Sequence, residues 1–501
     1  MSRITNNIPA VVAQRHLGGS QKDLRVSLER LSSGLRINRG ADDPAGLIVS
    51  ERLRSEINAV GQAVKNSERA INVIATTEGA LNEVSALLND INALLIEAAN
   101  KGAFSDEEVA ANQLQIDSAI DSINRIANTT TFAGRKLLDG SLDYVTSGVN
   151  GYALADVQIL GAKFGTREFV DVDVVVTSAA QPARMGFGFV AGQTALGADG
   201  LYRIGSAVTI DIQGVEGVAT LNFPASASIP DIVRAINAQT DATGVLATSA
   251  AVGGTAGAGI EMYSRGYGSD QFVRVQEVFG SGPFGTVDLL NHNNDDPFVP
   301  AERRRVEGHD AEGTINGAPT VGQGLVLQLN SFLLDVKLTL DETFGIGSTT
   351  FAITGGGSLF QLGPRINTNQ QENIGVRAMH ANKLGNRVVG FLSWLQDGQQ
   401  FAMRNTQNLQ KASDVVNEAI DQVSVLRGRL GAFERNTLQA NIAQLQITSE
   451  NLTSSESVIR DTDFAVETTE LTRAQVLVQA GNSILAIANA QQQNVLSLLG
   501  G

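Results

Sequence analysis

Apolar residues recur at helical spacing over long stretches at both ends of this 501-residue chain. Near the N-terminus the stripe runs through Leu17, Leu24, Leu28 and Leu31, and near the C-terminus it runs through Leu471, Val478, Leu485, Val495 and Leu499. Steps of three, four and seven residues dominate, which aligns the side chains on one face of a helix and is typical of coiled-coil-like packing. We predict long helices at both ends that pack against each other.

The last of these segments is apolar on nearly every side. It carries Leu477, Val478, Ile484, Leu485 and Ile487 within about three helical turns. A helix with apolar residues all round needs burial on more than one face. We therefore expect the terminal helices to complete their hydrophobic core between copies of the chain.

The middle of the chain has a different composition. Residues 141–360 hold 32 of the 52 glycines, 7 of the 10 prolines and 18 of the 24 Phe and Tyr residues. Such clustering is typical of strands and turns. The predicted fold is a mainly α terminal stalk of long coiled-coil-like helices from both chain ends, with an inserted β-rich α+β central domain.

Charge and residue usage exclude several classes of function. The net charge is −15 and no cysteine is present, which argues against nucleic-acid binding, disulfides and thiolate chemistry. No apolar run reaches the roughly 20 residues that span a bilayer, and the N-terminus has no secretory h-region. We expect no membrane insertion, and any export would use another route.

The segment LSSGLRINRGADDPAG (31–46) interrupts the helical pattern with glycines, a proline and four charges. It matches neither of the glycine-rich phosphate-binding motifs. Asp43 followed by Pro44 instead fits an N-cap and the first helical residue. We predict a joint between helical segments, paired with SSESVIRDTDF (454–464), in which the following residues take part: Gly34, Arg36, Arg39, Asp42, Asp43, Pro44, Arg460, Asp461 and Asp463.

No residue pattern predicts catalysis, a cofactor or a metal. The four histidines are scattered and none lies in an HExxH motif. NHNNDDPF (291–298) is rich in oxygen ligands but lacks the spacing of a calcium loop, so a solvated turn is favoured. We expect no enzyme.

Four blocks of the sequence resemble one family. LERLSSGLRINRGADDPAGLIVSERLRSEI (28–57), TTEGALNEVSALLNDINALL (76–95) and NTTTFAGRKLLDG (128–140) resemble the N-terminal region of bacterial flagellins, and residues 454–501 resemble the flagellin C-terminus. The resemblance implies a structural subunit that is exported by the flagellar type III apparatus and polymerises into the extracellular flagellar filament for motility.

The resemblance also implies a layout and partners. Residues 1–32 and 454–501 would supply the inner-layer helices, with the C-terminal segment including a linker; residues 33–140 and 358–453 would supply a second layer with its linker and return; and 141–357 would be a variable surface insertion. Partners would be further copies of the chain, the flagellar cap and hook-associated proteins, and an export chaperone that binds the C-terminal helix.

The insertion contains one recognisable pattern. AVTIDIQGVEGVATLNF (207–223) alternates and turns at glycines, which predicts a hairpin. SIPDIVRAINAQT (228–240) predicts a short helix capped by Ser228, and GVLATSAA (244–251) predicts a returning strand. This ββαβ order near 207–251 resembles the IN-type repeat of flagellin and hook-protein insertions.

One helical segment matches a site of immune recognition. In many flagellins the segment corresponding to residues 89–96 is bound by a vertebrate innate immune receptor, which favours an arginine at the position of Asp90 and a glutamate at that of Ala93. This chain has NDINALLI there, and the residues that match the site are Asn89, Asp90, Ile91, Asn92, Leu94 and Leu95. We expect weak receptor activation, with Ile91, Leu94 and Leu95 left available for packing in the filament.

Two alternatives remain open from the sequence. A hook–filament junction protein shares the terminal helices, although the near-complete match of both terminal blocks argues against it. The central insertion could instead be a binding domain displayed on the filament.

Overall fold

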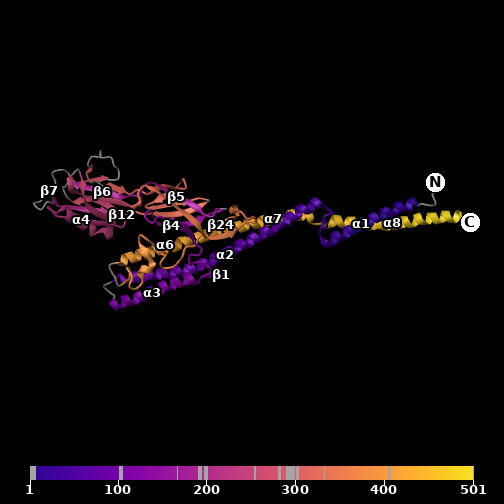
Figure 1. Cartoon of the computed structure of the whole chain (residues 1–501), viewed down its shortest axis with the longest axis horizontal. Coiled ribbons are helices and arrows are strands. Elements are labelled where there is room, and N and C mark those ends of the chain that lie inside the picture. Colours follow the sequence, from indigo (N-terminus) through magenta and orange to yellow (C-terminus); the bar gives the residue numbers. More distant parts are fainter. Residues whose placement is uncertain are drawn as a thin grey trace. The chain divides into compact units, whose positions relative to one another are not determined.

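The computed structural model describes residues 7–100, 105–165, 167–189, 194–196, 201–252, 255–279, 284–288, 299–300, 304–331, 333–403 and 408–499 (Figure 1). These residues divide into two compact units. The first unit contains residues 1–72, 360–371 and 431–501, and the second contains residues 73–359 and 372–430. Helices from both chain ends and strands from the middle confirm the predicted fold class.

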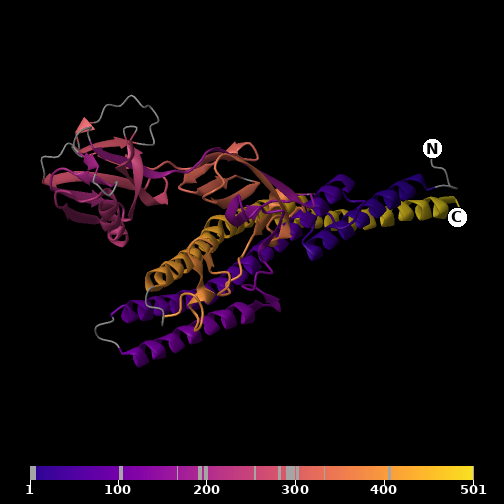
Figure 2. The same ribbon diagram turned by 60° about the vertical axis from the view of Figure 1, so that its left-hand side comes forward.

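The first unit is helical. It contains α1 (Ile8–Ser33), the first part of α2 (Pro44–Ala98), the π-helical turn Glu434–Gln439, α7 (Ala440–Arg460) and α8 (Phe464–Leu499). The described termini of α1 and α8 lie together, and the two helices run side by side (Figures 1 and 2). Val60 and Ala63 of α2 pack on Leu445 of α7, so this pair has a small core of its own.

The second unit holds three further long helical segments. These are the rest of α2, α3 (Asp106–Thr129) and α6 (Leu409–Phe433), whose inward faces carry buried aliphatic side chains. Ser105 and Glu108 form a capping box at the start of α3, since each side chain accepts a hydrogen bond from the other's backbone N–H.

The chain returns from the insertion to α6 through residues 358–403, which we call the return segment. Polar side chains fix its irregular part, residues 375–403, between α3 and α6. Gln113 of α3 donates to Leu395 O at 2.8 Å and accepts from Met403 N at 2.7 Å. Gln422 of α6 both donates to Gly385 O (2.9 Å) and accepts from Gly385 N (3.1 Å). Amide side chains therefore satisfy backbone groups that no strand or helix pairs.

The insertion consists of two β lobes. The first lobe has one sheet in the order β18-β17-β5-β22-β3 and another in the order β19-β20-β21-β4. Its strands are β3 (Tyr144–Ser147), β4 (Leu154–Ala162), β5 (Val170–Ser178), β17 (Glu312–Ile315), β18 (Ala318–Pro319), β19 (Val321–Gln323), β20 (Val326–Asn330), β21 (Leu334–Leu340) and β22 (Gly347–Gly356). Alternate residues of these strands, such as Val172, Val174 and Val176, meet in one core.

The second lobe is inserted into the first, between β5 and β17. Its sheets have the orders β10-β9-β13-β16 and β11-β12-β6-β14-β15, and α4 (Ile229–Asn237) buries Ile229, Ile232 and Ile236 in the same core. The strands are β6 (Pro182–Phe189), β9 (Val208–Gln213), β10 (Val218–Phe223), β11 (Val245–Val252), β12 (Thr255–Tyr267), β13 (Phe272–Phe279), β14 (Phe284–Asp288), β15 (Val299–Pro300) and β16 (Arg304–Glu307).

Short elements complete the described chain. The hairpin strands β1 (Thr131–Phe132) and β2 (Arg135–Lys136) follow α3, and β7 (Thr194–Leu196), β8 (Tyr202–Ile204) and α5 (Thr240–Thr243) belong to the second lobe. The return carries β23 (Ser358–Gln361), η1 (Thr368–Gln370), β24 (Gln371–Ile374), β25 (Gly385–Asn386), β26 (Gly390–Phe391) and η2 (Leu392–Leu395).

The predicted ββαβ order is present, with one difference. β9 and β10 form the hairpin, Ser228 accepts from Asp231 N at the start of α4, and β11 returns. However, β11 pairs with β12 in the other sheet and not with the hairpin. The local pattern predicted the elements, but the pairing of β11 depends on a strand that follows it in the chain.

Tyr144 joins strands of the first lobe to the return segment. Its hydroxyl group donates to Asn373 O at 3.1 Å and accepts from Ala162 N at 3.0 Å. Burial raises the pKa of Tyr144 to about 12 from its ordinary value of 10.0. The neutral phenol is thus the form that the folded lobe stabilises.

This hydroxyl group should make stability depend on alkaline pH. Because the folded-state pKa is raised, the stabilisation is complete below the ordinary pKa of 10.0 and is lost as pH rises through about 12. Tyr144→Phe should lower the free energy of unfolding by about 1–3 kcal/mol at neutral pH, since Ala162 N is left unpaired. The variant should also lose less stability than the unmodified protein as the pH rises. Urea unfolding across this pH interval measures both effects. Tyr152→Phe is the matched control because Tyr152 is 86% exposed; equal behaviour of the two variants would contradict the prediction.

Candidate functional site: the terminal helix pair and its joint

The helices α1 and α8 form an antiparallel pair. Asn7 Nδ2, at the start of α1, donates to Ala488 O at 3.1 Å, and Arg30, near its end, lies 3.4 Å from Glu467. Between these anchors, Gly481 faces Leu17 so closely that an added Cβ would lie 3.1 Å from Leu17 Cδ1. The two chain ends therefore meet along almost the whole length of α1.

The seam between the two helices follows strict heptad steps. Its buried or half-buried residues are Ala10, Ala13, Leu17, Ser20, Leu24, Ser27 and Leu31 on α1, and Glu467, Leu471, Ala474, Val478, Gly481, Leu485 and Ala488 on α8. Seven of these fourteen are Ala, Gly or Ser. Small residues let the backbones approach closely, but they bury little apolar surface.

Large aliphatic side chains remain on the outside of the pair. On α1 these include Val11 (64% exposed), and on α8 they include Val476 (57%), Ile484 (57%) and Ile487 (60%). Other large apolar residues exposed on the pair are Ile8, Val12, Leu28, Phe464, Val466 and Leu477. Large apolar side chains exposed in such number on one helix pair are a feature of interaction sites.

The predicted packing residues fall into three groups. Leu17 is buried, and Leu24, Leu31, Leu471, Val478 and Leu485 are half-buried on the seam. Leu28 lies off the seam and is 49% exposed, because the seam passes through Ser27 and Leu31. The side chains of Val495 and Leu499 lie outside the described residues.

At the joint, the breaks that follow α1 and α7 pair with each other. Gly34 ends α1 with a left-handed conformation (φ 73°), which glycine adopts without strain. Leu35 and Asp461 then form an antiparallel bridge, in which Arg36 N donates to Arg460 O at 2.7 Å. The predicted pairing of the two segments is present, although residues 454–460 are helical and only Asp461–Asp463 interrupts the helix.

Aspartates cap the helices and the turn at the joint. Asp43 Oδ1 accepts from Gly46 N at 2.8 Å and Pro44 opens α2, which confirms the predicted cap. Asp463 Oδ1 accepts from Ala465 N at 2.9 Å at the start of α8. The hydrogen bond from Arg39 N, supported by one from Asn38 N, lowers the pKa of Asp42.

The arginines have partners that the sequence did not indicate. Arg39 binds Glu29 through Nε and Nη2, both at 3.1 Å, and Arg460 lies 2.9 Å from Glu51. Arg36 donates to Ile459 O at 2.6 Å and is only loosely paired with Asp43, at 3.9 Å. Both missed glutamates lie on the flanking helices, where spacing from the turn gives no signal of contact.

The segment of residues 89–96 corrects one expectation. Ile91 and Leu95 are 0% and 2% exposed within the second unit, so they are not available for packing in a filament. They continue the buried stripe of Leu81, Val84 and Leu88 along α2. Asn89, Asp90 and Ala93 are exposed, whereas Asn92 and Leu94 are half-buried.

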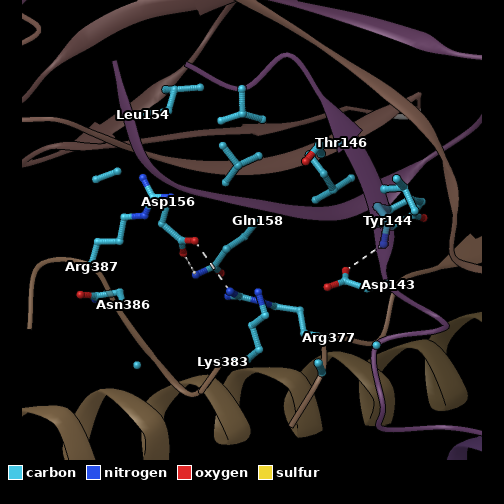
Figure 3. Close-up of a pocket in the computed structure, with 18 of the residues that line it drawn as sticks. Asp143, Tyr144, Thr146, Leu154, Asp156, Gln158, Arg377, Lys383, Asn386 and Arg387 are labelled. Atoms are coloured by element: carbon cyan, nitrogen blue, oxygen red, sulfur yellow. Dashed lines mark hydrogen bonds and ion pairs between the residues drawn. The ribbon is translucent and has the colours of Figure 1, made fainter. Parts of the chain in front are cut away.

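The second unit also contains a polar hollow of about 730 Å³ between β3, β4 and the loop of residues 377–391 (Figure 3). Asp156 accepts from Gln158 at 2.8 Å and lies 3.7 Å from Arg377. Burial raises the pKa of Asp143. The Asp143 carboxylate accepts a hydrogen bond from Tyr144 N, which Figure 3 shows. The described lining of the hollow contains neither histidine nor cysteine.

Three further predictions concern ligands and membranes. Residues 291–298 lie outside the described residues. Within the described ranges, no group of three His, Asp or Glu side chains has a metal-binding arrangement. None of the helices found there combines the length and the hydropathy that crossing a membrane requires.

The chain combines a pair of terminal helices that expose large apolar side chains with an inserted β domain. These features are those of a structural subunit that assembles with copies of itself. Sequence comparison identifies the family. Residues 4–143 match the bacterial flagellin N-terminal helical region, and residues 413–499 match the bacterial flagellin C-terminal helical region. The B-type flagellin of Pseudomonas aeruginosa is 31% identical, and the alignment covers 99% of both chains.

Other relatives agree along the whole length. Flagellin B of Vibrio cholerae is 27% identical and a flagellin of Salmonella typhimurium is 29% identical, each with 99% of both chains covered. The chain belongs to the bacterial flagellins. It is a structural subunit that is exported, polymerises into the extracellular flagellar filament and serves motility. The full-length match to flagellins does not favour a junction protein.

Gly46 should be required for the geometry of the joint. A Cβ there would lie 2.4 Å from Asp43 Oδ2 and 2.8 Å from Ile37 Cδ1, so Gly46→Ala must displace the helix cap or the buried Ile37. We expect a loss of about 1–3 kcal/mol in the free energy of unfolding of the first unit and weaker or misshapen filaments. Gly40→Ala is the control, since its Cβ would meet only Leu47 at 3.6 Å. Denaturation and electron microscopy of filaments measure the effects, and indistinguishable variants would contradict the prediction.

Proposed function

We propose that the α1–α8 pair forms the inner layer of the filament and that its outward aliphatic side chains make the contacts between subunits. The observation that carries this proposal is that large apolar side chains of both helices remain exposed outside the seam, while half of the seam residues are Ala, Gly or Ser. Burying one such side chain contributes about 1.5–3 kcal/mol. Several of them on each subunit give enough free energy to drive polymerisation of an acidic chain.

The other predicted layers follow the same scheme. Residues 33–140 and 358–453 form the second layer, with the joint near Gly34 and Asp461 as the connection to the inner layer. Residues 141–357 form the surface insertion, since both β lobes have closed cores that need no neighbouring subunit. The subunit has a structural role without catalysis, and no feature of the polar hollow favours a second function for the insertion.

Further partners are proposed for the same helices. The flagellar cap and hook-associated proteins meet the terminal helices at the ends of the filament. An export chaperone binds the C-terminal helix before assembly, because Val476, Leu477, Ile484 and Ile487 are exposed in the single subunit and would promote premature association.

Polymerisation should depend on the exposed stripe of α8 and not on its seam alone. Leu477→Gln with Ile484→Gln removes two exposed apolar side chains seven residues apart while keeping helix propensity. The monomer should keep its helical circular dichroism, and the critical concentration for seeded polymerisation should rise about tenfold or more. Leu477→Met with Ile484→Met is the matched control and should polymerise normally. A double-glutamine variant with an unchanged critical concentration would refute the proposed contact surface.

Receptor recognition should be weak. Asp90 is exposed and places a negative charge where recognition favours arginine, and Ala93 is exposed where recognition favours glutamate. Asp90→Arg with Ala93→Glu should therefore increase activation in a receptor reporter cell assay by about tenfold or more, if two charged contacts of about 1 kcal/mol each are restored. Glu83→Arg is the control, because it reverses an exposed charge on the same helix outside the matching segment and should leave activation unchanged. High activity of the unmodified chain would contradict the expectation.

A further inference from the structure

Two short segments join the β lobes. The chain enters the second lobe between β5 and β6, through residues 179–181, and leaves it between β16 and β17, through residues 308–311. The two segments lie side by side and form an antiparallel bridge, which we call the crossing. In it, Gln181 N donates to His309 O at 2.8 Å and His309 N donates to Gln181 O at 3.0 Å. The narrow crossing is visible in Figure 2. Two strands alone would leave the lobes free to bend about it.

One carboxylate ties both lobes to this crossing. Asp310 accepts from Ser269 N at 3.0 Å and from Ser269 Oγ at 2.5 Å, and Ser269 lies in the β12–β13 turn of the second lobe. Asp310 also accepts from Gly324 N at 2.7 Å, in the β19–β20 turn of the first lobe. A separate bond from Gln323 Nε2 to Asp270 Oδ2, 3.1 Å long, joins the end of β19 to the β12–β13 turn.

The hydrogen bonds to Asp310 favour its charged form. Burial alone would raise the pKa of Asp310, but the bonds from Ser269 and Gly324 outweigh that effect, and the pKa is lowered. Hydrogen bonds to a charged acceptor are stronger than those between neutral groups. The carboxylate thus holds two turns that belong to different hydrophobic cores.

Glycines let the backbones of the two lobes touch at this point. A Cβ on Gly268 would lie 2.6 Å from both Asp310 Oδ1 and Gly324 Cα, and one on Gly308 would lie 2.4 Å from Gly268 O. One on Gly322 would lie 1.8 Å from Ala311 O. The crossing is therefore closely packed by backbone and leaves no room for side chains at these positions.

From this geometry we infer that Asp310 locks the second lobe onto the first, so that the two lobes act as one rigid arm. Without the carboxylate, the crossing would keep its backbone hydrogen bonds and the Gln323–Asp270 bond. It would lose the three bonds by which one charged group holds Ser269 and Gly324 together. The lock acts on the orientation of the lobes and not on the folding of either, because each lobe has its own core. In a flagellin, it would fix how the outer part of the insertion is held.

The absence of cysteine from the chain allows a direct test. Asn222→Cys on β10 and Thr350→Cys on β22 place one exposed spin label on each lobe of the full-length protein. Pulsed electron paramagnetic resonance then gives the distribution of distances between the labels. The unmodified lock should give one narrow distribution, and Asp310→Ala should widen it about twofold or more, as expected for a released hinge.

A matched control separates the lock from ordinary turn capping. Asp341 accepts from Thr343 N at 2.9 Å and from Thr343 Oγ1 at 2.6 Å, the same chemistry within the first lobe alone. Asp341→Ala should leave the distribution narrow. If Asp310→Ala fails to fold, Ser269→Ala with Gln323→Ala removes side-chain bonds between the lobes more gently and should also widen the distribution. A distribution that is already broad in the unmodified chain, or stays narrow in a folded lock variant, would overturn the inference.

Discussion

The seam between α1 and α8 is the constraint on which the rest of the first unit depends. Its alanines, serines and glycine bring two backbones close together, as the contact between Gly481 and Leu17 illustrates. These small residues bury less apolar surface than leucines would, and large aliphatic side chains outside the seam remain exposed. In the proposed inner layer, such a pair is completed by neighbouring subunits. On that proposal, stability of the chain ends and assembly of the filament are coupled.

The joint connects the α1–α8 pair to α2 and α7. The chain is interrupted twice at the same place, between α1 and α2 and between α7 and α8, and the backbone groups left unpaired at these helix ends need partners. The chain meets this requirement by pairing the breaks with each other, through Arg36 N to Arg460 O and Thr462 N to Gly34 O at 2.9 Å. Aspartates then cap the helices that begin at the joint, while Glu29 and Glu51 neutralise two arginines.

Features with a local cause could be predicted from the sequence. Periodicity placed the helices, Asp43–Pro44 marked the start of α2, and Ser228 marked that of α4. Features set by distant partners could not. The exact phase of a stripe decides whether Leu28 or Ser27 faces α8, and bundle packing buries Ile91 and Leu95. The partners of Arg39 and Asp310 lie outside their own turns, so no spacing rule reveals them.

The insertion obeys a different rule from the chain ends. Each lobe closes its own core, and each is attached through a small number of polar groups: Asp310 between the lobes, and Tyr144 between the first lobe and the return segment. Arg429 of α6 adds a hydrogen bond to Leu160 O in the first lobe, and the loss of hydration on burial lowers its pKa. Directional polar contacts fix orientation, whereas the exposed apolar side chains of the chain ends are proposed to be buried by other subunits. On that proposal, the β lobes could change without altering the surface by which the subunit polymerises.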